Sequence, residues 1–421
     1  MRQLRGLTAL LTLVTFAATA QESYRIVESV SDCVNVRVEP RVDSDSIACL
    51  AANAPATVIS SKPYWREIGF GASNHGWIAK KYLVSDPIPP VAPVPTPLPS
   101  NMWLTVNFVD VGQGDAIWIH TADDDIDGNG IFEGRNIVID GGPYSADASN
   151  ALLKYLRDSA HHFAIIDALF LTHPHDDHYS GVDTLVRHFE INDYYDPGMP
   201  GTASYQALLN SFTAPGRKVN HVHRTPGNLG TLDWGHELKA EILYSWPGSN
   251  AGLGSGNTLI NNASIVLKLT YGTQSFLFMG DAEGKERSDP PATPKYAEAR
   301  LLSGGTNLAS TVLKIAHHGS ETSSTLPFIN AVNPDYVIVE SGRKCFNGTH
   351  LPDMTTLARY CAHNPNVHIY RTDEGDAALD AKGAVNGDNI VLRTNGQATE
   401  VLEGTQANCN GLSTQVPDQS C

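Results

Sequence analysis

The sequence lacks three features that would each have narrowed its function. It has no C-x-x-C pair, which argues against a cysteine zinc site. It has no long apolar run beyond residue 20, so we expect a mature protein without a membrane-spanning segment. It is also short of positive charge, with 29 Lys and Arg against 45 Asp and Glu and a formal charge of −16. Such an acidic surface opposes non-specific binding to nucleic acid, so a polyanionic substrate has to be held locally, by metals and a few cations.

The apolar stretch that does occur lies at the start of the chain. Arg2 and Arg5 precede the apolar segment 7–17, and residues 18–20 read Ala-Thr-Ala, as at a cleavage site. This pattern predicts a secretory signal peptide over residues 1–20, and the segment is short for a retained membrane anchor. Cleavage removes two arginines and no acid, which takes the formal charge from −16 to −18. We therefore expect a secreted or periplasmic protein.

The sequence has six cysteines, and an even number in an exported chain indicates disulfides. Their number does not fix the pairing, but a proline-rich segment separates the first two from the rest. We expect Cys33–Cys49, and then Cys345–Cys361 and Cys409–Cys421.

Residues 86–100 hold seven prolines and divide the chain into two modules. Proline at every second or third place favours extended polyproline II, so this segment is a semi-rigid linker. The first module, residues 21–85, has short alternating apolar runs between turn residues, which is typical of a small all-β barrel. The second, residues 101–405, is long enough to bury a large core. Residues 406–421 form a polar tail pinned by cysteines.

Three stretches of the first module are informative: Val34-Asn35-Val36-Arg37 with Glu39-Pro40, Trp65-Arg66-Glu67-Ile68, and Gly76-Trp77-Ile78-Ala79-Lys80-Lys81-Tyr82-Leu83. In these the module resembles bacterial SH3-like domains. The resemblance implies a module that binds cell-wall peptides or other proteins, with a groove lined by Tyr64, Trp65, Trp77 and Tyr82. The alternative is that tryptophans fill the core of the barrel, and this is the role that we expect for Trp77.

The second module alternates strand-like apolar runs with helical or irregular stretches, which predicts α/β layers with the chemistry at strand ends. Apolar residues recur at helical spacing in residues 148–159, so we expect a helix there. The expected strands are 103–109, 116–120, 136–140, 164–171, 264–270, 275–279, 312–316 and 336–340.

The strongest functional signal is Thr172-His173-Pro174-His175-Asp176-Asp177-His178, directly after the expected strand 164–171. Imidazoles and carboxylates at the end of a buried strand predict a metal site, since imidazole suits zinc and carboxylate also suits manganese or iron. The spacing can supply two metals, with His173 and His175 on one and Asp177 and His178 on the other. The alternative is a polar surface loop that is rich in histidine.

Later strands end on further candidate ligands. Asp281 follows the strand 275–279, and His317 and His318 follow the strand 312–316. We expect Asp281 to bridge two metals and His317, in preference to His318, to complete the second one. Such a pair activates a water and polarises a phosphoryl or carbonyl oxygen. The alternatives are that Asp281 caps a turn and that His318 is a packed surface imidazole.

Together with these segments, further stretches carry a resemblance: Phe108-Val109-Asp110-Val111-Gly112-Gln113-Gly114-Asp115-Ala116, Ile139-Asp140-Gly141-Gly142, Met279-Gly280-Asp281-Ala282, Lys314-Ile315-Ala316-His317-His318-Gly319-Ser320 and Tyr370-Arg371-Thr372-Asp373. The second module resembles the metallo-β-lactamase superfamily, and within it the hydrolase domain attached to ComEC-type DNA-uptake channels. The resemblance implies an α/β four-layer αββα sandwich with two divalent metals, zinc in the first place or else manganese, at one edge.

Three departures from the family pattern matter. The sequence has no transmembrane channel, so DNA uptake itself is not implied. The stretch 261–267 lacks the histidine that many members supply there, which argues against β-lactam or glutathione-thioester hydrolysis. A late Gly-His-Pro is replaced by residues 347–352, in which His350 keeps the place of the family histidine. We expect Asp177, His318 and His350 to be catalytic, the two imidazoles gripping the substrate or protonating the leaving group. The alternative for His350 is an ordinary loop histidine.

Other acidic residues have supporting roles in this interpretation. Asp110, Asp115 and Asp140 are expected to be structural or to hold the ligands from behind. The stretch 112–115 is not a nucleotide fingerprint, because it lacks the third glycine. The cations available to a polyanionic substrate are Lys314, Arg343, Lys344 and Arg371.

Asp125, Asp127 and Asn129 precede Gly130 with the spacing of a calcium loop. The twelfth position of such a loop needs an acid, and here it is Asn136. An acidic turn between two strands explains the segment equally well, so a structural calcium stays one of two interpretations.

We expect an exported metal-dependent hydrolase, specifically a phosphodiesterase that acts on nucleic acid. One alternative is a cell-envelope esterase, for example one that cleaves phosphorylcholine esters, held at its site by the SH3-like module. The other is a non-catalytic wall-binding protein.

Overall fold

The computed structural model describes residues 23–26, 33–85 except 53, 63 and 71–73, 102–122, 134–158 except 144, 163–224, 230–342 except 236, 345–374 except 347–348, 385, 387–407 and 409. The predicted signal peptide, the linker, the candidate calcium residues Asp125, Asp127 and Asn129, and the cations Arg343 and Lys344 lie outside the described residues. No helix in the described part is long and apolar enough to cross a bilayer.

The chain divides into two compact units, residues 1–96 and 97–421, and the division falls within the proline-rich segment. Unit 1 is all-β, as predicted. Its antiparallel sheet has the order β3-β2-β6-β5-β4-β1-β7. The elements are β1 (Ser23–Ile26), β2 (Cys33–Arg37), β3 (Ser46–Ala51), β4 (Pro55–Ser61), β5 (Trp65–Phe70), β6 (Asn74–Ala79), the 3-10 turn η1 (Lys80–Tyr82) and β7 (Leu83–Ser85).

The prediction that Trp77 fills the core of unit 1 is wrong. Successive side chains of a strand point to opposite faces, and on β6 Gly76 and Ile78 take the inner face. Trp77 therefore lies on the outer face, partly exposed, with the Lys62 ammonium 4.8 Å from its ring centre. The core consists of aliphatic side chains instead, among them the fully buried Ile68 and Ile78.

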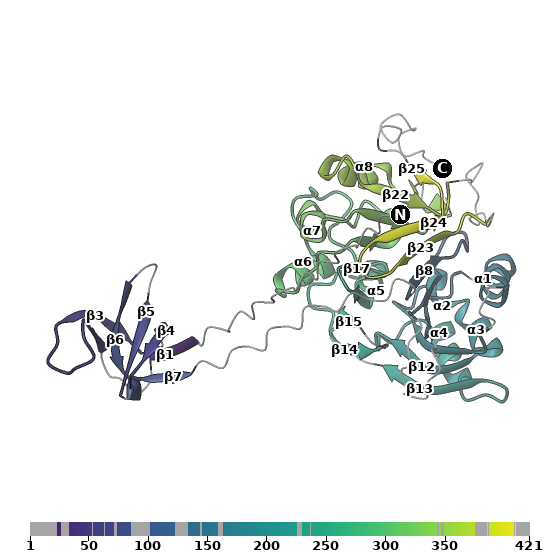
Figure 1. The fold of residues 1–421 in the computed structure, drawn as a ribbon. Helices are drawn as coiled ribbons and strands as arrows, with labels where there is room; N and C mark the ends of the chain where they lie inside the picture. Colours follow the sequence, from purple (N-terminus) through teal and green to yellow (C-terminus); the bar gives the residue numbers. More distant parts are fainter. Residues whose placement is uncertain are drawn as a thin grey trace, which may run out of the picture. The chain divides into compact units, whose positions relative to one another are not determined.

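Unit 2 contains two eight-stranded sheets (Figure 1). Sheet 1 has the order β13-β12-β11-β10-β9-β8-β23-β24, and sheet 2 the order β14-β15-β16-β17-β18-β19-β22-β25. The strands of sheet 1 are β8 (Leu104–Phe108), β9 (Ile117–His120), β10 (Asn136–Ile139), β11 (Ile165–Phe170), β12 (Glu190–Asp196), β13 (Lys218–Arg224), β23 (Ile390–Thr394) and β24 (Thr399–Glu403). Those of sheet 2 are β14 (Gly230–Asp233), β15 (Leu238–Tyr244), β16 (Val266–Tyr271), β17 (Gln274–Phe278), β18 (Val312–Lys314), β19 (Tyr336–Val339), β22 (His368–Arg371) and β25 (Gln406–Ala407). The predicted tail thus begins with a strand.

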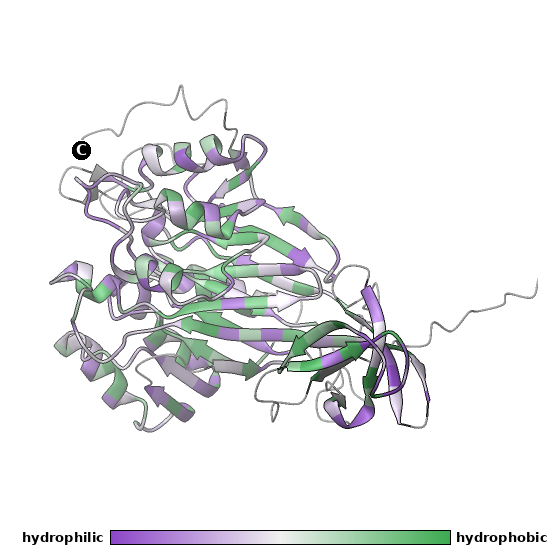
Figure 2. Cartoon of the chain, turned by 90° about the vertical axis from the view of Figure 1, so that its left-hand side faces the viewer, coloured by the Kyte–Doolittle hydropathy of each residue, from purple (hydrophilic) through white to green (hydrophobic). Residues whose placement is uncertain are grey.

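Helices cover the outer face of each sheet. α1 (Ala146–Asp158), α3 (Val182–His188) and α4 (Ala203–Ser211) pack on sheet 1, and α6 (Tyr296–Ser303), α7 (Leu326–Val332) and α8 (Met354–His363) pack on sheet 2. A third apolar cluster, with Phe108 and Phe278, fills the space between the sheets. The interior strands of unit 2 are accordingly coloured mostly as hydrophobic in Figure 2. The predicted four-layer αββα sandwich is therefore confirmed.

The topology explains why distant segments meet at one edge. β10, β11, β12 and β13 run parallel in sheet 1, and β17, β18, β19 and β22 run parallel in sheet 2. The carboxyl ends of parallel strands lie at the same edge of a sheet. Loops that follow β10, β11, β17 and β18 therefore collect there, and these loops hold the predicted ligands.

Of the two disulfides among the described residues, one agrees with the prediction. Cys33–Cys49 joins β2 to β3, as predicted. Cys361, on α8, pairs with Cys409, so the predicted pairs Cys345–Cys361 and Cys409–Cys421 are wrong. The physical reason is that β25 adds to the edge of sheet 2 beside β22, which carries residue 409 to α8. The side chains of Cys345 and Cys421 lie outside the described residues.

The disulfide Cys361–Cys409 closes a loop with a sequence separation of 48. Replacing both cysteines by serine is expected to lower the free energy of unfolding of unit 2 by about 2–4 kcal/mol, because the open loop gains entropy in the unfolded chain. Urea unfolding of the double variant measures this. The double variant of Cys33–Cys49, in unit 1, is the control and is expected to leave the unfolding of unit 2 unchanged. A non-reducing peptide map that joined Cys361 to another cysteine would contradict the pairing.

Candidate metal centre

The histidine-rich motif folds into a turn and the short helix α2 (Asp176–Tyr179), at the carboxyl end of β11. Two glycines allow this helix to lie against the end of β10. A side chain at Gly181 would place its Cβ 1.7 Å from the carbonyl oxygen of Gly141, so only glycine fits there. The amide of Gly141 in turn donates to the carbonyl of His178 at 2.8 Å. The backbone contact fixes where the side chain of His178 projects.

Asp281 lies at the centre of the candidate ligands. Its Oδ2 is 3.6 Å from His173 Nε2, 3.4 Å from His178 Nε2 and 3.6 Å from His318 Nε2. These imidazoles come from the loops after β11 and β18, on different sheets. One carboxylate oxygen that faces three ring nitrogens can serve two cations at once.

The ring nitrogens fall into two groups around this oxygen. In the first, His173 Nε2 and His175 Nδ1 are 3.0 Å apart, and both belong to a group with Asp281 whose ligand atoms converge. In the second, Asp177 reaches His318 Nε2 at 3.4 Å through Oδ2 and His178 Nε2 at 3.9 Å through Oδ1. The structure thus brings His173, His175, Asp177, His178 and Asp281 together, as the sequence analysis expects.

The residues present fit a pair of divalent cations. His175 Nε2, His178 Nε2, His318 Nε2 and Asp281 Oδ1 are buried and have no hydrogen-bond partner among the described residues. A buried polar atom left unpaired costs about 1–3 kcal/mol. The chemistry of the set, imidazole nitrogens with two carboxylates, is that of zinc and manganese sites.

The positions of His317 and His318 differ from the sequence prediction, which expects His317 as the ligand in preference to His318. His318, not His317, points its Nε2 at Asp177 and Asp281. Both ring nitrogens of His317 have other neighbours: Nδ1 lies 3.1 Å from Glu283 Oε1, and Nε2 lies 3.4 Å from the Asn261 amide. Both histidines have φ of 51°, in the left-handed region, and their ring centroids lie 6.2 Å apart at an angle of 61°. Sequence adjacency alone does not show which of them points inward.

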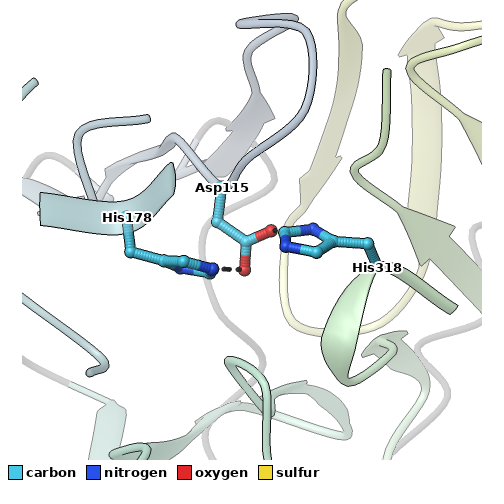
Figure 3. A group of neighbouring side chains, drawn as sticks. All are labelled: Asp115, His178 and His318. Carbon is cyan, nitrogen blue, oxygen red and sulfur yellow. Dashed lines mark ion pairs between the residues drawn. The ribbon is translucent and has the colours of Figure 1, made fainter. Parts of the chain in front are cut away.

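Asp115 supports two of the imidazoles from behind (Figure 3). Its carboxylate lies 3.2 Å from His318 Nδ1 and 3.9 Å from His178 Nδ1. These three residues are close enough to hold a metal themselves. The Lys314 ammonium, however, is already paired with Asp115 and supplies a permanent positive charge at that place. We therefore assign Asp115 to orienting the rings, with Nε2 of each left for the metal side.

Asp140 and Asp110 act further back. Asp140 lies 2.8 Å from His178 Nδ1 and accepts hydrogen bonds from both the amide and the hydroxyl of Thr172. Asp110 accepts hydrogen bonds from the amides of Gly112 and Gly387, and so it joins the two loops that contain these glycines.

Acidic residues outnumber permanent cations among the residues of this candidate centre. Burial by itself raises the pKa of Asp281, but the charges of His318 and His178 hold that pKa well below its usual range. Conversely, burial opposes the charged form of His318, while Asp281 and Asp115 raise the pKa of its imidazole to about 10. Burial lowers the pKa of His173, so that its ring is neutral and keeps a lone pair for a metal. A site with this balance attracts cations.

The remaining predicted residues are placed differently. Lys314 and Arg371 are buried and paired with Asp115 and Asp373, so neither is available to a substrate, contrary to the prediction. His350 is buried in the hairpin of β20 (Cys345–Phe346) and β21 (Thr349–His350). The chain after it packs against the turn that carries His318, since a Cβ at Gly319 would lie 2.7 Å from Pro352 Cβ.

Sequence reasoning missed two supporting residues. The hydroxyl of Ser264 accepts from the amide of Asp281 at 3.0 Å and lies 3.4 Å from His173 Nδ1. Glu340 accepts from the amide of Ala116, and its backbone carbonyl lies 2.9 Å from His318 Nδ1. Their signal in the sequence is position alone, since Ser264 is the first residue of one expected strand and Glu340 the last residue of another.

Residues 131–198, which include the histidine-rich motif, match the Metallo-beta-lactamase superfamily. Unit 2 is therefore similar to that superfamily over this segment. Its αββα layers and its candidate ligands at the strand ends agree with the match. Members of this superfamily are metal-dependent hydrolases, and the chain has the candidate ligands for such a site.

Three curated proteins with competence-related or recombination names are similar to this chain. ComE operon protein 3 of Bacillus subtilis (strain 168) is 24% identical over 64% of this chain and 32% of its own length. Recombination protein 2 of Haemophilus influenzae is 25% identical over 67% of this chain and 28% of its own length. Competence protein ComA of Neisseria gonorrhoeae is 35% identical over 27% of this chain and 14% of its own length. The chain thus spans about a third or less of these relatives.

Among solved structures, a subclass B3 metallo-beta-lactamase, MEM-A1, is 13% identical, with a TM-score of 0.33 over 57% of this chain and 92% of that one. A diphosphatase from the PhnP family is 14% identical, with a TM-score of 0.31 over 56% of this chain and 85% of that one.

The buried pair Lys314–Asp115 generates a prediction. Lys314→Met leaves the Asp115 carboxylate without its cation, which is expected to lower the free energy of unfolding by about 3–5 kcal/mol. Zinc affinity is expected to fall about 10–100-fold as well, because the rings of His178 and His318 lose their orientation. Urea unfolding and equilibrium dialysis measure the two effects.

The matched control is Lys218→Met, which removes a lysine that is 70% exposed and paired on the surface with Glu190. Surface pairs contribute about 0–1 kcal/mol. Equal losses of stability in the two variants would contradict the role of Lys314.

Proposed function

We propose that this chain is an exported metal-dependent hydrolase that cleaves phosphodiester bonds, with nucleic acid as its substrate class. The observation that carries the proposal is the position of Asp281 Oδ2, 3.4–3.6 Å from three imidazole nitrogens on two sheets. A carboxylate oxygen shared between two sets of ligands can hold two cations close together, as a dinuclear hydrolytic site needs.

The ligands divide into two sets around the shared oxygen. His173, His175 and Asp281 would hold one cation, and Asp177, His178, Asp281 and His318 the other. Two divalent metals bound there would supply a nucleophile at neutral pH and polarise a phosphoryl oxygen. Zinc suits the imidazole-rich set, and manganese suits the carboxylates.

Two further roles in the reaction fall to Asp177 and His350. The Asp177 side chain is 20% exposed, whereas that of Asp281 is nearly buried, so Asp177 is the carboxylate that approaches the solvent side of the site. We assign Asp177 to orienting the attacking water in addition to its ligand role. We assign His350 to the leaving group, because the chain that directly follows it packs against the turn of His318.

The choice of phosphodiesters rests on the relatives and on the ligand set. The names of the similar proteins refer to competence and recombination, both of which concern DNA. The chain covers only the smaller part of those proteins, so their whole activity is not transferred. The stretch 261–267 lacks the histidine found in many superfamily members, and the amide of Asn261 there donates to Glu283. The difference favours a substrate class other than lactams or thioesters.

Unit 1 favours a second candidate, an esterase of the cell envelope. We propose that unit 1 is an SH3-like domain that binds a cell-wall peptide, and that the chain is secreted or periplasmic. An aromatic surface supports this: Tyr64 is 81% exposed, and Trp65 and Trp77 are partly exposed instead of buried. A phosphorylcholine ester is the substrate that we would expect at such a location.

The first prediction compares neighbouring histidines. His318→Gln is expected to reduce kcat/KM on bis-(p-nitrophenyl) phosphate by more than about 100-fold, since it removes a ligand rather than an outer partner of one. His317→Gln, the matched control, keeps a hydrogen-bonding side chain beside Glu283 and is expected to lose less than about 10-fold. The opposite order of losses would return the ligand role to His317.

The second prediction concerns substrate class and metal. The protein treated with a chelator and then reloaded with zinc or manganese is assayed on single- and double-stranded DNA, bis-(p-nitrophenyl) phosphate and p-nitrophenyl-phosphorylcholine. We expect DNA cleavage that is lost on chelation, restored by metal and absent in His175→Ala. Turnover of the choline ester alone would favour the envelope esterase. Metal binding without turnover of any ester would favour a non-catalytic binding protein.

A further inference from the structure

The outermost strand of sheet 1, β13, is joined to β12 by a row of acid–base pairs. The two strands are parallel and in register, with Glu190 opposite Lys218, Asp193 opposite His221, Tyr195 opposite His223 and Asp196 opposite Arg224. At one end Lys218 pairs with Glu190 at 3.1 Å, and at the other Arg224 pairs with Asp196 at 3.0 Å. Both ends of the row therefore join a carboxylate to a permanent cation.

The middle of the row differs, because Asp193 faces two imidazoles. Its Oδ1 lies 2.7 Å from His223 Nε2 and 3.5 Å from His221 Nδ1. No lysine or arginine of the described residues pairs with this carboxylate. Histidine, unlike lysine and arginine, carries no permanent charge. Asp193 is therefore the carboxylate of the row without a permanent cation beside it.

Donor atoms of the types that zinc takes lie near one another at this position. His221 and His223 are two residues apart on a strand, so their side chains project from the same face, and Asp193 joins them from the neighbouring strand. The ring of His223 is held by stacking on Tyr195, with centroids 4.5 Å apart and an angle of 16°. Tyr195 stacks in turn on the buried Phe170, at 4.5 Å and 7°. The ligand atom of His223 is therefore already directed at Asp193.

His221 is the adjustable member. Its side chain is 70% exposed, and its ring centroid is 6.3 Å from that of His223. Zinc takes imidazole nitrogen at about 2.0–2.1 Å and carboxylate oxygen at about 2.0–2.2 Å. The His221 ring has to move toward Asp193 to close on such an ion, and its exposure leaves it room to do so.

We propose that Asp193, His221 and His223 form a zinc site on the open edge of sheet 1, in addition to the candidate metal centre. Two imidazoles and a carboxylate form a donor set that zinc favours, and solvent fills the remaining position. The ion supplies the missing counter-charge and links the edge strand β13 to β12. The proposal does not depend on the proposed function, because it concerns different residues and a binding measurement.

The test is the number of zinc ions bound by the whole chain. Equilibrium dialysis against buffered zinc, with elemental analysis, is carried out on the unmodified protein, His221→Gln and His223→Gln. We expect each variant to bind about one ion fewer, or to bind that ion more than about 100-fold more weakly, since a ligand is lost. Hydrolysis of bis-(p-nitrophenyl) phosphate is expected to be unchanged in both variants.

Two controls separate this site from other histidines. His188→Gln removes an exposed histidine whose Nδ1 lies 2.8 Å from the Thr184 carbonyl of its own helix, and this variant is expected to bind as much zinc as the unmodified protein. In a protein that already carries Asp281→Asn, adding His223→Gln is still expected to remove about one bound zinc ion. That result would distinguish the zinc site on β13 from the candidate metal centre. Equal zinc content in the unmodified protein and both histidine variants overturns the proposal, and so does an equal loss in His188→Gln.

Discussion

The buried pair between Lys314 and Asp115 is the contact on which the rest of the candidate centre depends. It places one permanent positive charge among several carboxylates, at the point where the two sheets approach each other. Asp115 comes from the loop before β9, and Lys314 ends β18, so the pair also joins sheet 1 to sheet 2. A buried ion pair adds little to stability by itself, but one partner left alone is costly. The pair thus fixes both the position of the rings and their electrostatic setting.

The two sheets contribute to the centre in complementary ways. Sheet 1 supplies the histidine-rich motif in one continuous segment, which holds its shape through the contact of Gly141 with Gly181. Sheet 2 supplies Asp281 and His318 from the ends of adjacent parallel strands. Neither sheet holds a complete ligand set. The apolar cluster between the two sheets therefore holds the two parts of the candidate ligand set together.

The α/β layers and the candidate ligands of unit 2 can be predicted from the sequence, because apolar runs mark buried strands and the motif follows one of them. Of the sixteen strands in the two sheets, eight are not among the expected ones: β12–β15 and β22–β25. β12 and β13 are missed because their polar residues interrupt any clear apolar face. The choice between His317 and His318 was also out of reach, because it depends on backbone dihedrals and on Glu283 and Asn261. Likewise Cys409 finds Cys361 only through the pairing of β25 with β22. Such contacts between distant segments leave no local pattern.

The neighbours of β8 have a consequence for how the domain can be assembled. β8 opens unit 2, yet one of the two strands that flank it is β23, near the other end of the chain. The adjoining loops are bound together by Asp110 and Asn389, which are 279 residues apart. A ribosome that delivers the chain from its N-terminus releases all the candidate metal ligands before β23 emerges. Until then β8 is an edge strand of sheet 1. The histidine-rich motif is therefore synthesised before the sheet that carries it is complete, and it can meet the metal ions of its surroundings in that state.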